Sequence, residues 1–392
     1  MTQTPHRIEA VQAPVIPEIA ELIAAHPGTI SLGQGVVNYG PPKSTLERIQ
    51  NFLSQPVNHK YQHVQGIPEL ITAITQKLES DNGVGLIGRD IVVTAGSNMG
   101  FLNAILAITD PGDEVILLRP FFFNQEMALT IAGCTAVVVD TDENYQPDLE
   151  KIAAAITPRT RAVVTISPNN PTGAVYSREM LTQINALCGG RGVYHISDEA
   201  YEHFTYAGTE HFSPAAIVGG EGHTIALFSL SKGFGFASWR IGYMVAPHKL
   251  TTSIKKIQDT NLICPPVISQ HAALATFEAG RAYCEPHVRA LSDVREMTLE
   301  LLGELGDRIV VPHASGAFYF LIRVASDLAP MKLVEELIKQ FGVAVIPGTT
   351  FGVSDACTLR IAYGALDKDG VAEGLGRLTS GLKKFCVVGG LR

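Results

Sequence analysis

The sequence lacks both a dense run of Lys and Arg and a long uninterrupted apolar run. It has 30 Lys and Arg against 38 Asp and Glu, a net charge of −8, so the positive footprint that nucleic-acid binders use is missing. No apolar stretch reaches the roughly 18 residues of a spanning helix, and residues 1–14 lack the basic segment and apolar core of a signal peptide. We therefore expect a cytoplasmic protein with neither nucleic acid nor membrane as a partner.

Cysteine and histidine are present, but not in the spacings of metal sites. The cysteines are widely scattered and form no CxxC pair of a zinc or redox centre. His59 and His63 lack the intervening Glu of a zinc-protease helix, and no third ligand is suggested. We expect buried, reduced thiols and no bound metal. The cysteines are Cys134, Cys188, Cys264, Cys284, Cys357 and Cys386.

The middle of the chain has the pattern of a parallel sheet. The chain has 392 residues, 46% of them hydrophobic, which suffices for two domains that share a cleft. Short apolar runs, rich in β-branched residues, alternate with helix-like segments and show little polar alternation, as strands covered on both faces do. This predicts a doubly wound α/β domain. The expected strands are 91–93, 114–118, 135–139, 162–166, 193–196 and 224–228.

The C-terminal third predicts a smaller α/β layer that closes the cleft. Apolar residues recur at helical spacing over 282–305, which reads as one long helix that opens a second domain. Residues 316–324 and 342–347 are typical of strands, with an amphipathic helix over 331–341 between them. The N-terminal stretch reads as a helix and an extended arm. The expected division is an arm at 1–45 that joins the small domain, a large domain at 46–283 and a small domain at 284–392.

Ligands of open parallel sheets bind beyond the carboxyl ends of the strands, and polar clusters follow four of the expected strands. In the first, Gly96, Ser97 and Asn98 precede a helix that starts near Met99. The free N–H groups and positive end of that helix favour a phosphate. An ordinary helix cap would explain the same residues.

The second and third clusters supply an amide and a carboxylate. Asn170, in PNNPTG, could donate to the phenolic oxygen of an aromatic cofactor, although a tight turn also explains this sequence. Asp198 and Glu199 directly follow an apolar run, where an unpaired carboxylate would be costly. A cation should therefore compensate it.

The fourth cluster supplies an amine. Lys232 follows a buried strand, where burial and nearby cations would lower its pKa and free the amine to form a Schiff base. Ser229, Ser231 and Arg240 add donors suited to a phosphate. Taken singly, Ser-Lys-Gly is only a turn. Pyridoxal phosphate, however, requires a lysine, a carboxylate for its ring nitrogen, and donors for its phosphate and phenolate, and the four clusters together supply all of them.

The chain resembles the fold-type I, class I/II aminotransferases, nearest in pattern to the subgroup with aspartate and kynurenine aminotransferases. The matching motifs are KYQHVQGIPEL, TAGSNMG, PNNPTG, SDEAYEHF, SLSKGFGFASWRIGY, PGTTFG and LRIAYG, in the family's order and spacing. The resemblance spans nearly the whole chain. It implies a three-layer large domain with a mostly parallel sheet, a smaller α/β C-terminal domain and pyridoxal 5′-phosphate as cofactor.

The resemblance also implies residue roles. Lys232 would be the Schiff-base lysine and the general base, Asp198 would pair with the pyridine nitrogen, and Asn170 and Tyr201 would hold the phenolate oxygen. Asn170 would also border the substrate. The residues implied for the phosphate are Ser229, Arg240, Gly96, Ser97 and Asn98.

Four further positions concern the ring, the substrate and a second subunit. Phe122 matches the aromatic residue that stacks on the ring, although packing alone would explain it. Arg360 matches the arginine that grips the substrate carboxylate, with a surface arginine as the alternative. Gly35 falls where the family brings backbone close to that carboxylate. Tyr61 resembles the tyrosine that reaches the phosphate from the partner subunit, which implies a homodimer.

The resemblance implies an amino acid and a 2-oxo acid as substrates, and the sequence suggests their type. Residues 36–38, Val-Val-Asn, stand where relatives commonly carry a proline, and this arm borders the substrate pocket. No second arginine suits a side-chain carboxylate. Neutral substrates, aromatic or sulfur-containing, are therefore favoured over aspartate. The aromatic residues expected near the pocket are Tyr39, Phe122, Phe318 and Tyr319.

Three other kinds of function fit parts of the sequence. The same residues could support β-elimination, as in C–S lyases, or the ring-forming chemistry of aminocyclopropane-carboxylate synthases. A cofactor-binding homologue without activity is a second alternative, but the intact Lys232, Asp198 and Arg360 argue against it. A Rossmann dehydrogenase is disfavoured because the glycines at 33–35 and 233–235 lack the third glycine and the strand-turn-helix setting.

Overall fold

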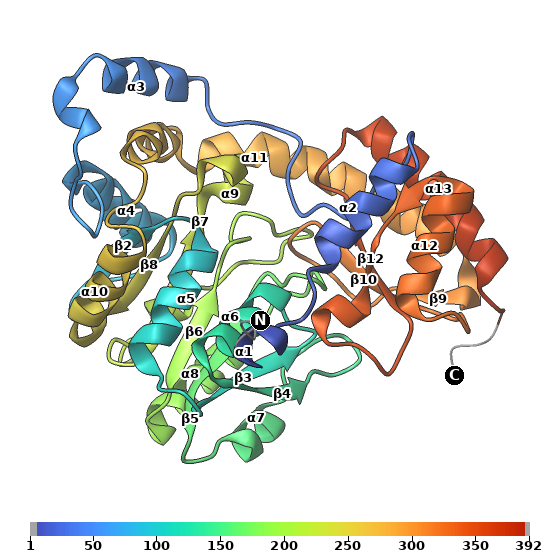
Figure 1. Cartoon of the computed structure of the whole chain (residues 1–392), viewed down its shortest axis with the longest axis horizontal. Coiled ribbons are helices and arrows are strands. Elements are labelled where there is room, and N and C mark those ends of the chain that lie inside the picture. The colour runs from blue at the N-terminus through green and yellow to red at the C-terminus, as the bar shows by residue number, and fades with distance from the viewer. Residues whose placement is uncertain (1–5, 389–392) are drawn as a thin grey trace, which may run out of the picture.

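A central sheet of seven strands organises the computed structural model, which describes residues 6–388 (Figure 1). All neighbours pair in parallel except β8, which is antiparallel to both β2 and β7. The six strands expected from the sequence are confirmed, and β8 is the one that the apolar patterning missed. In spatial order they are β2 (Arg89–Thr94), β8 (Gly242–Pro247), β7 (Thr224–Ser229), β6 (Tyr194–Asp198), β5 (Thr160–Ile166), β3 (Glu114–Arg119) and β4 (Thr135–Asp140).

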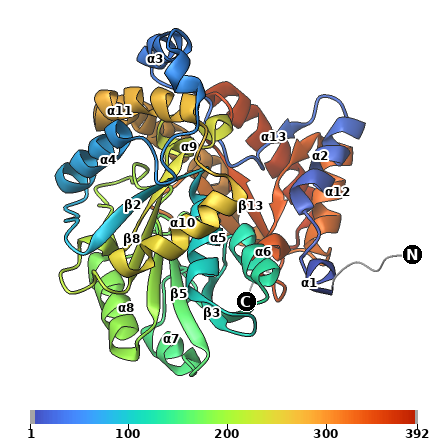
Figure 2. The ribbon, with the colours of Figure 1, turned by 60° about the vertical axis from the view of Figure 1, so that its left-hand side comes forward.

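Helices cover both faces of this sheet, which gives the three layers expected (Figure 2). Ile91 and Val93 pack with α4 (Pro68–Asp81) and the first half of α11 (Val267–Gly303). Val92 points the other way and packs with α5 (Ser97–Ile108) and α10 (Thr251–Asn261). Apolar residues on both faces explain why these strands read as continuous runs rather than as alternating patterns.

A smaller antiparallel sheet forms the C-terminal layer, in the order β12 (Ile346–Pro347), β13 (Thr358–Ala362), β10 (Tyr319–Val324) and β9 (Ile309–Val310). The N-terminal arm reaches it because β1 (Ile30–Ser31) pairs in parallel with β11 (Val343–Ala344). The expected strand at 342–347 is therefore two short strands in different sheets. The domain bounds predicted from the sequence remain a prediction.

The long helix expected over 282–305 corresponds to the second part of α11, which begins earlier, at Val267, and ends two residues sooner, at Gly303. The backbone of Gly280 is not helical there, with φ 59 and ψ −164, and Pro286 lies within the helix. A break at Gly280 explains why helical spacing could be followed only from about residue 282. α11 therefore runs from the large sheet to the C-terminal layer (Figure 1).

Among residues 6–388, no helix combines the length and the apolar character needed to cross a bilayer. The remaining helices are α1 (His6–Glu9), α2 (Val15–Ala25), α3 (Ser44–Leu53), α6 (Phe123–Ala132), α7 (Leu149–Ala155), α8 (Arg178–Arg191), α9 (Leu230–Gly233), α12 (Pro330–Phe341) and α13 (Lys368–Phe385). The short 3-10 turns are Pro56–His59, Pro214–Ala216, Ala237–Trp239, His248–Leu250, Gly306–Arg308 and Gly348–Phe351.

Candidate active site

A cavity of about 400 Å³ lies beyond the carboxyl ends of β5, β6 and β7. It collects residues from the large sheet, from the N-terminal arm and from β13, so segments far apart in the sequence meet there. Of the residues predicted from the sequence, those that line the cavity are Gly35, Ser97, Asn98, Phe122, Asn170, Asp198, Tyr201, Ser229, Ser231, Lys232, Arg240, Tyr319 and Arg360.

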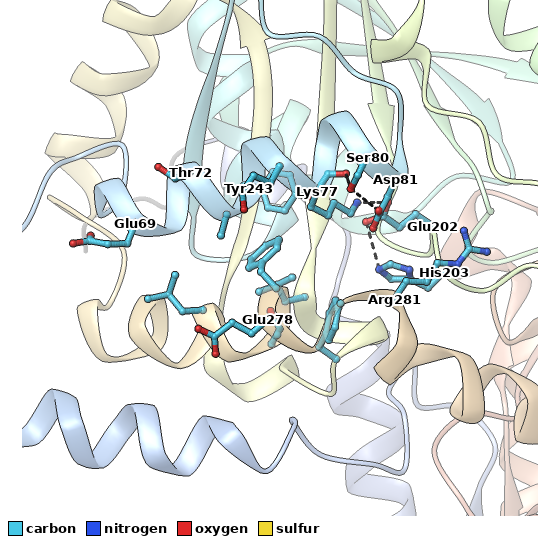
Figure 3. A pocket seen from close by; sticks show the side chains of 18 of the residues that line it. Glu69, Thr72, Lys77, Ser80, Asp81, Glu202, His203, Tyr243, Glu278 and Arg281 are labelled. Atoms are coloured by element: carbon cyan, nitrogen blue, oxygen red, sulfur yellow. Dashed lines mark hydrogen bonds and ion pairs between the residues drawn. The ribbon is translucent and has the colours of Figure 1, made fainter.

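A second hollow, of about 610 Å³, lies on the other side of the Lys232 turn, between α4 and α11 (Figure 3). Two pairs of charged side chains in it neutralise each other: Lys77 with Glu202 at 2.5 Å, and Arg48 with Glu278. None of the residues predicted from the sequence lines it. We therefore take the smaller cavity as the candidate active site.

Lys232 lies on the single turn of α9, directly after β7. Its Nζ donates a hydrogen bond to the carbonyl of Gly35 on the arm. Burial lowers the pKa of the amine to about 8, helped by the charges of Arg360 and Arg240 and opposed by Asp198. An appreciable fraction of the amine is therefore neutral, and so nucleophilic and basic, near physiological pH.

Asp198 ends β6 at the wall of the same cavity, with 6% of its surface exposed. Burial raises the pKa of its carboxyl to about 6. Two donors oppose this effect: the Gln125 side-chain amide at 2.9 Å and the backbone N–H of Ala200 at 3.2 Å. Such a carboxylate stays ionised at neutral pH and favours a cationic partner in the cavity.

Gln125 lies on α6 and is buried, and its contact with Asp198 was not expected from the sequence. Its signal was a polar side chain three residues after Phe122, in the first turn of the helix that Phe122 precedes. Nothing in the sequence links this position to Asp198, since the two residues meet only through tertiary packing.

Arg360 is 3% exposed, so a surface arginine is excluded. Its guanidinium donates to the Asn170 side-chain oxygen at 2.9 Å and to the Gly33 carbonyl at 2.6 Å. It also lies over the rings of Tyr319 and Phe351 at 4.7 and 4.9 Å. The Nε–H is buried without a partner among the described residues. An unpaired buried donor beside a cavity suits an anionic ligand.

Two phenols adjoin this arginine. The hydroxyls of Tyr201 and Tyr319 are 2.8 Å apart, and the Asn170 amide nitrogen lies 3.4 Å from the Tyr201 oxygen. Burial raises the pKa of both phenols, so both remain protonated at neutral pH. Tyr201 is thus a hydrogen-bond donor held in place at the cavity wall.

The opposite end of the cavity suits a phosphate. Gly96 precedes α5 with φ 82, and a Cβ there would overlap the Arg240 guanidinium, so only glycine fits. The first N–H groups of α5 have no partners within the helix, and they lie beside this cation. Ser229 and Ser231 complete this end, with the Ser231 N–H donating to the Ser229 hydroxyl at 3.1 Å. These residues fit the phosphate of the implied cofactor.

Not all of the predicted residues reach the cavity. Tyr61 is 79% exposed and borders a surface groove with Cys264 and Pro265 instead. Tyr39 and Phe318 do not line the cavity either, whereas Tyr319 does. The apolar residues that the sequence analysis missed at this site are Ile16, Phe123 and Ile166.

Comparison with known proteins agrees with this geometry. The family model "Aminotransferase class I and II" matches residues 27–378. An aspartate/prephenate aminotransferase of Thermus thermophilus is 38% identical over 82% of this chain and 83% of its own, and the aromatic aminotransferase ISS1 of Arabidopsis thaliana is 32% identical over 95% and 94%. The structure of Thermus thermophilus aspartate aminotransferase with maleate superposes with a TM-score of 0.88 at 32% identity, covering 97% of this chain and 100% of that one.

Both relatives are similar to this chain over more than four fifths of its length, and the family model spans most of the chain. The family implies dependence on pyridoxal phosphate, and a β-lyase is not favoured. The chain belongs to the class I and II aminotransferases and is a transaminase.

Proposed function

We propose that this transaminase moves the amino group of a neutral or aromatic L-amino acid to a 2-oxo acid, with pyridoxal phosphate bound in the cavity of about 400 Å³. The observation that carries the proposal is that the Lys232 amine, the Asp198 carboxylate and the Arg360 guanidinium all line this cavity. An amine, an acid and an anion-binding group are the three protein groups that the reaction needs.

The cofactor would be held at both ends. Arg240, Ser229 and the N-terminus of α5 would bind its phosphate, while Asp198 would pair with its ring nitrogen. Asn170 and Tyr201 would donate to its phenolate oxygen. When bound, the cofactor supplies an aldehyde that takes up the amino group and a ring that stabilises negative charge at the substrate Cα.

Lys232 would supply the amine for that aldehyde and would then move the proton at the substrate Cα. Its pKa of about 8 suits both tasks, because general bases work best when their pKa is near the working pH. The ionised Asp198 would keep the ring nitrogen protonated. Arg360 would orient the substrate by pairing its unpartnered Nε–H and a neighbouring N–H with the α-carboxylate.

The walls of the cavity support a neutral or aromatic side chain. Ile16, Phe122, Phe123 and Tyr319 line it. Among the described residues that line it, Lys232, Arg240 and Arg360 are the only cations, and each has a role elsewhere in the proposal. Relatives of this chain are named for both aspartate and aromatic substrates. Half-reaction rates across a panel of amino acids test the choice, and a preference for aspartate over phenylalanine would contradict it.

We further propose a homodimer that works in the cytoplasm. Leu53, Val57, Tyr61 and Ile263 are large hydrophobic residues exposed in one chain, which supports a covered interface in that part of the surface. Tyr61 would then contact the cofactor phosphate of the partner subunit. All 6 cysteines are unpaired, as expected in a reducing compartment.

Replacing the proposed reactive amine tests the mechanism. We expect Lys232→Ala to lower kcat by about 10⁴-fold or more, because both the covalent attachment and the proton transfer lose their group. The visible absorbance of the bound cofactor should change as well. Steady-state kinetics and absorbance spectra measure both, with Lys368→Ala on the exposed start of α13 as the matched control. Turnover at the wild-type rate in Lys232→Ala would end the proposal.

Arg360 is tested by separating binding from turnover. Arg360→Gln removes the charge and the paired donors, so KM for every amino acid should rise about 10- to 100-fold. Arg323→Gln, on the neighbouring strand β10, should leave KM unchanged. An unaltered KM in Arg360→Gln would exclude the proposed contact with the α-carboxylate.

Gln125 is tested through pH dependence. Its amide lowers the pKa of Asp198, so Gln125→Leu should raise that pKa further. The acidic limb of kcat/KM should then move to higher pH by about half a unit to one unit, the value of one hydrogen bond. Glu126→Gln on the same helix is the control, and an unchanged profile in Gln125→Leu would show that the amide has no such effect.

Tyr61 is tested by mixing two impaired proteins. If Tyr61 acts across the interface, a dimer of one Lys232→Ala chain and one Tyr61→Ala chain contains one site with both native residues. Random reassociation of equal amounts should restore roughly a quarter of wild-type activity, because half of the dimers are mixed and each has one such site. No recovery after subunit exchange would place Tyr61 outside the partner's site.

A further inference from the structure

The backbone of the Lys232 turn is held by a side chain of the N-terminal arm. The Tyr39 hydroxyl shares its one O–H between the carbonyl of Lys232 at 3.2 Å and the carbonyl of Gly233 at 3.3 Å. Burial raises the pKa of this phenol, so it is a protonated donor. The Cys284 thiol of α11, whose pKa burial raises to about 12, donates to the same Gly233 carbonyl at 3.2 Å.

Tyr39 is itself fixed by α11. Its ring stacks on His287, with centroids 3.7 Å apart and planes 9° from parallel. The Tyr283 hydroxyl donates to the carbonyl of Gly40, the next residue of the arm, at 2.5 Å. The Tyr39 ring is therefore held by the stack on His287, and the next residue of the arm is held by the hydrogen bond from Tyr283. These two contacts fix the position of the Tyr39 hydroxyl beside the carbonyls of the Lys232 turn.

The turn has no room to shift away from these contacts. Gly235 has φ 66, and a Cβ there would meet the Tyr39 carbonyl at 2.5 Å. A Cβ on Gly233 would meet the His203 ring at 2.6 Å. Figure 3 shows that ring at the edge of the hollow beyond the turn. The arm and the His203 segment therefore enclose the Lys232 turn from two sides.

The same arm also contacts the reactive ends of two side chains in the cavity. Its Gly35 carbonyl accepts from the Lys232 amine, and its Gly33 carbonyl accepts from Arg360 at 2.6 Å. One extended segment, 33–39, thus touches the amine, the backbone below the amine, and the proposed carboxylate-binding arginine. A change in the position of segment 33–39 would therefore move the Lys232 amine relative to Arg360.

We propose that Tyr39 is a positioning residue for the Lys232 amine: its hydroxyl fixes the carbonyls of the Lys232 turn and so sets where the amine lies in the cavity. The inference rests on the proposed role of Lys232. The charged groups that face the amine are Asp198 from β6, Arg360 from β13 and Arg240 from the segment before β8. Loosening the turn would let the Lys232 nitrogen, whether free or bonded to the cofactor, move away from the two arginines and toward water, which favours its protonated form.

The test compares Tyr39→Phe with Tyr283→Phe in the holoenzyme. Tyr39→Phe loses only the hydroxyl that holds the turn, whereas Tyr283→Phe loses a hydroxyl that holds the arm at Gly40. In Tyr39→Phe the pH midpoint of the cofactor's visible absorbance should rise by about 0.5 units, and kcat should fall about 5- to 10-fold with KM changed less than about twofold. Tyr283→Phe should shift the midpoint and lower kcat in the same direction but by clearly less, because the stacked His287 ring still holds Tyr39 in place.

Thermal unfolding separates positioning from stability, because both variants should lose a similar, small amount of Tm. His287→Leu removes the ring under Tyr39 and should shift the midpoint in the same direction by less. A wild-type midpoint in Tyr39→Phe, or an equal shift in Tyr283→Phe, would overturn the inference. If either outcome is found and Lys232→Ala is inactive, only the role of Tyr39 is rejected. If Lys232→Ala is active, the proposed function itself is rejected.

Discussion

Removal of water from one amine and one carboxylate is the constraint on which the site depends. Burial lowers the pKa of Lys232 to about 8 and raises that of Asp198 to about 6, so the two values approach each other from opposite ends of the scale. Burying either charge without a partner in such a cavity would cost free energy of folding. The arginines, the Gln125 amide and the backbone N–H of Ala200 adjust these pKa values, so the pair has the ionisation states that the proposed mechanism needs at neutral pH.

The sheet explains why these groups meet. Strands β5, β6 and β7 are parallel and adjacent, so the residues that follow them emerge at one edge. Asn170, Asp198 and Lys232 come from successive strands of this set. The antiparallel β8 then returns the chain beside β7, which brings Arg240 back to the start of α5. A cation and the N-terminus of a helix thereby lie together at the end of the cavity where the phosphate is proposed to bind.

The other half of the site comes from outside this sheet. Arg360 lies on β13 of the small sheet, and the arm that accepts its hydrogen bond is paired to that layer through β1 and β11. α11 links both parts and packs against the arm through Tyr283 and His287. Arg360, the proposed substrate-binding residue, and Lys232 are therefore connected through the arm and α11.

The sequence alone determined six of the seven strands of the large sheet and the polar residues that follow them, because strands buried on both faces leave continuous apolar runs and ligand groups cluster at strand ends. It also determined the family, through motifs in a fixed order. Tertiary structure alone decided the partners: Gln125 for Asp198, Gly33 for Arg360 across 327 residues, and Lys232 for Tyr39 across 193. Tyr39, which the sequence placed near the substrate pocket, instead contacts the backbone of the Lys232 turn. Such contacts depend on the packing of whole layers, and no local pattern records which distant side chain will fill a given position.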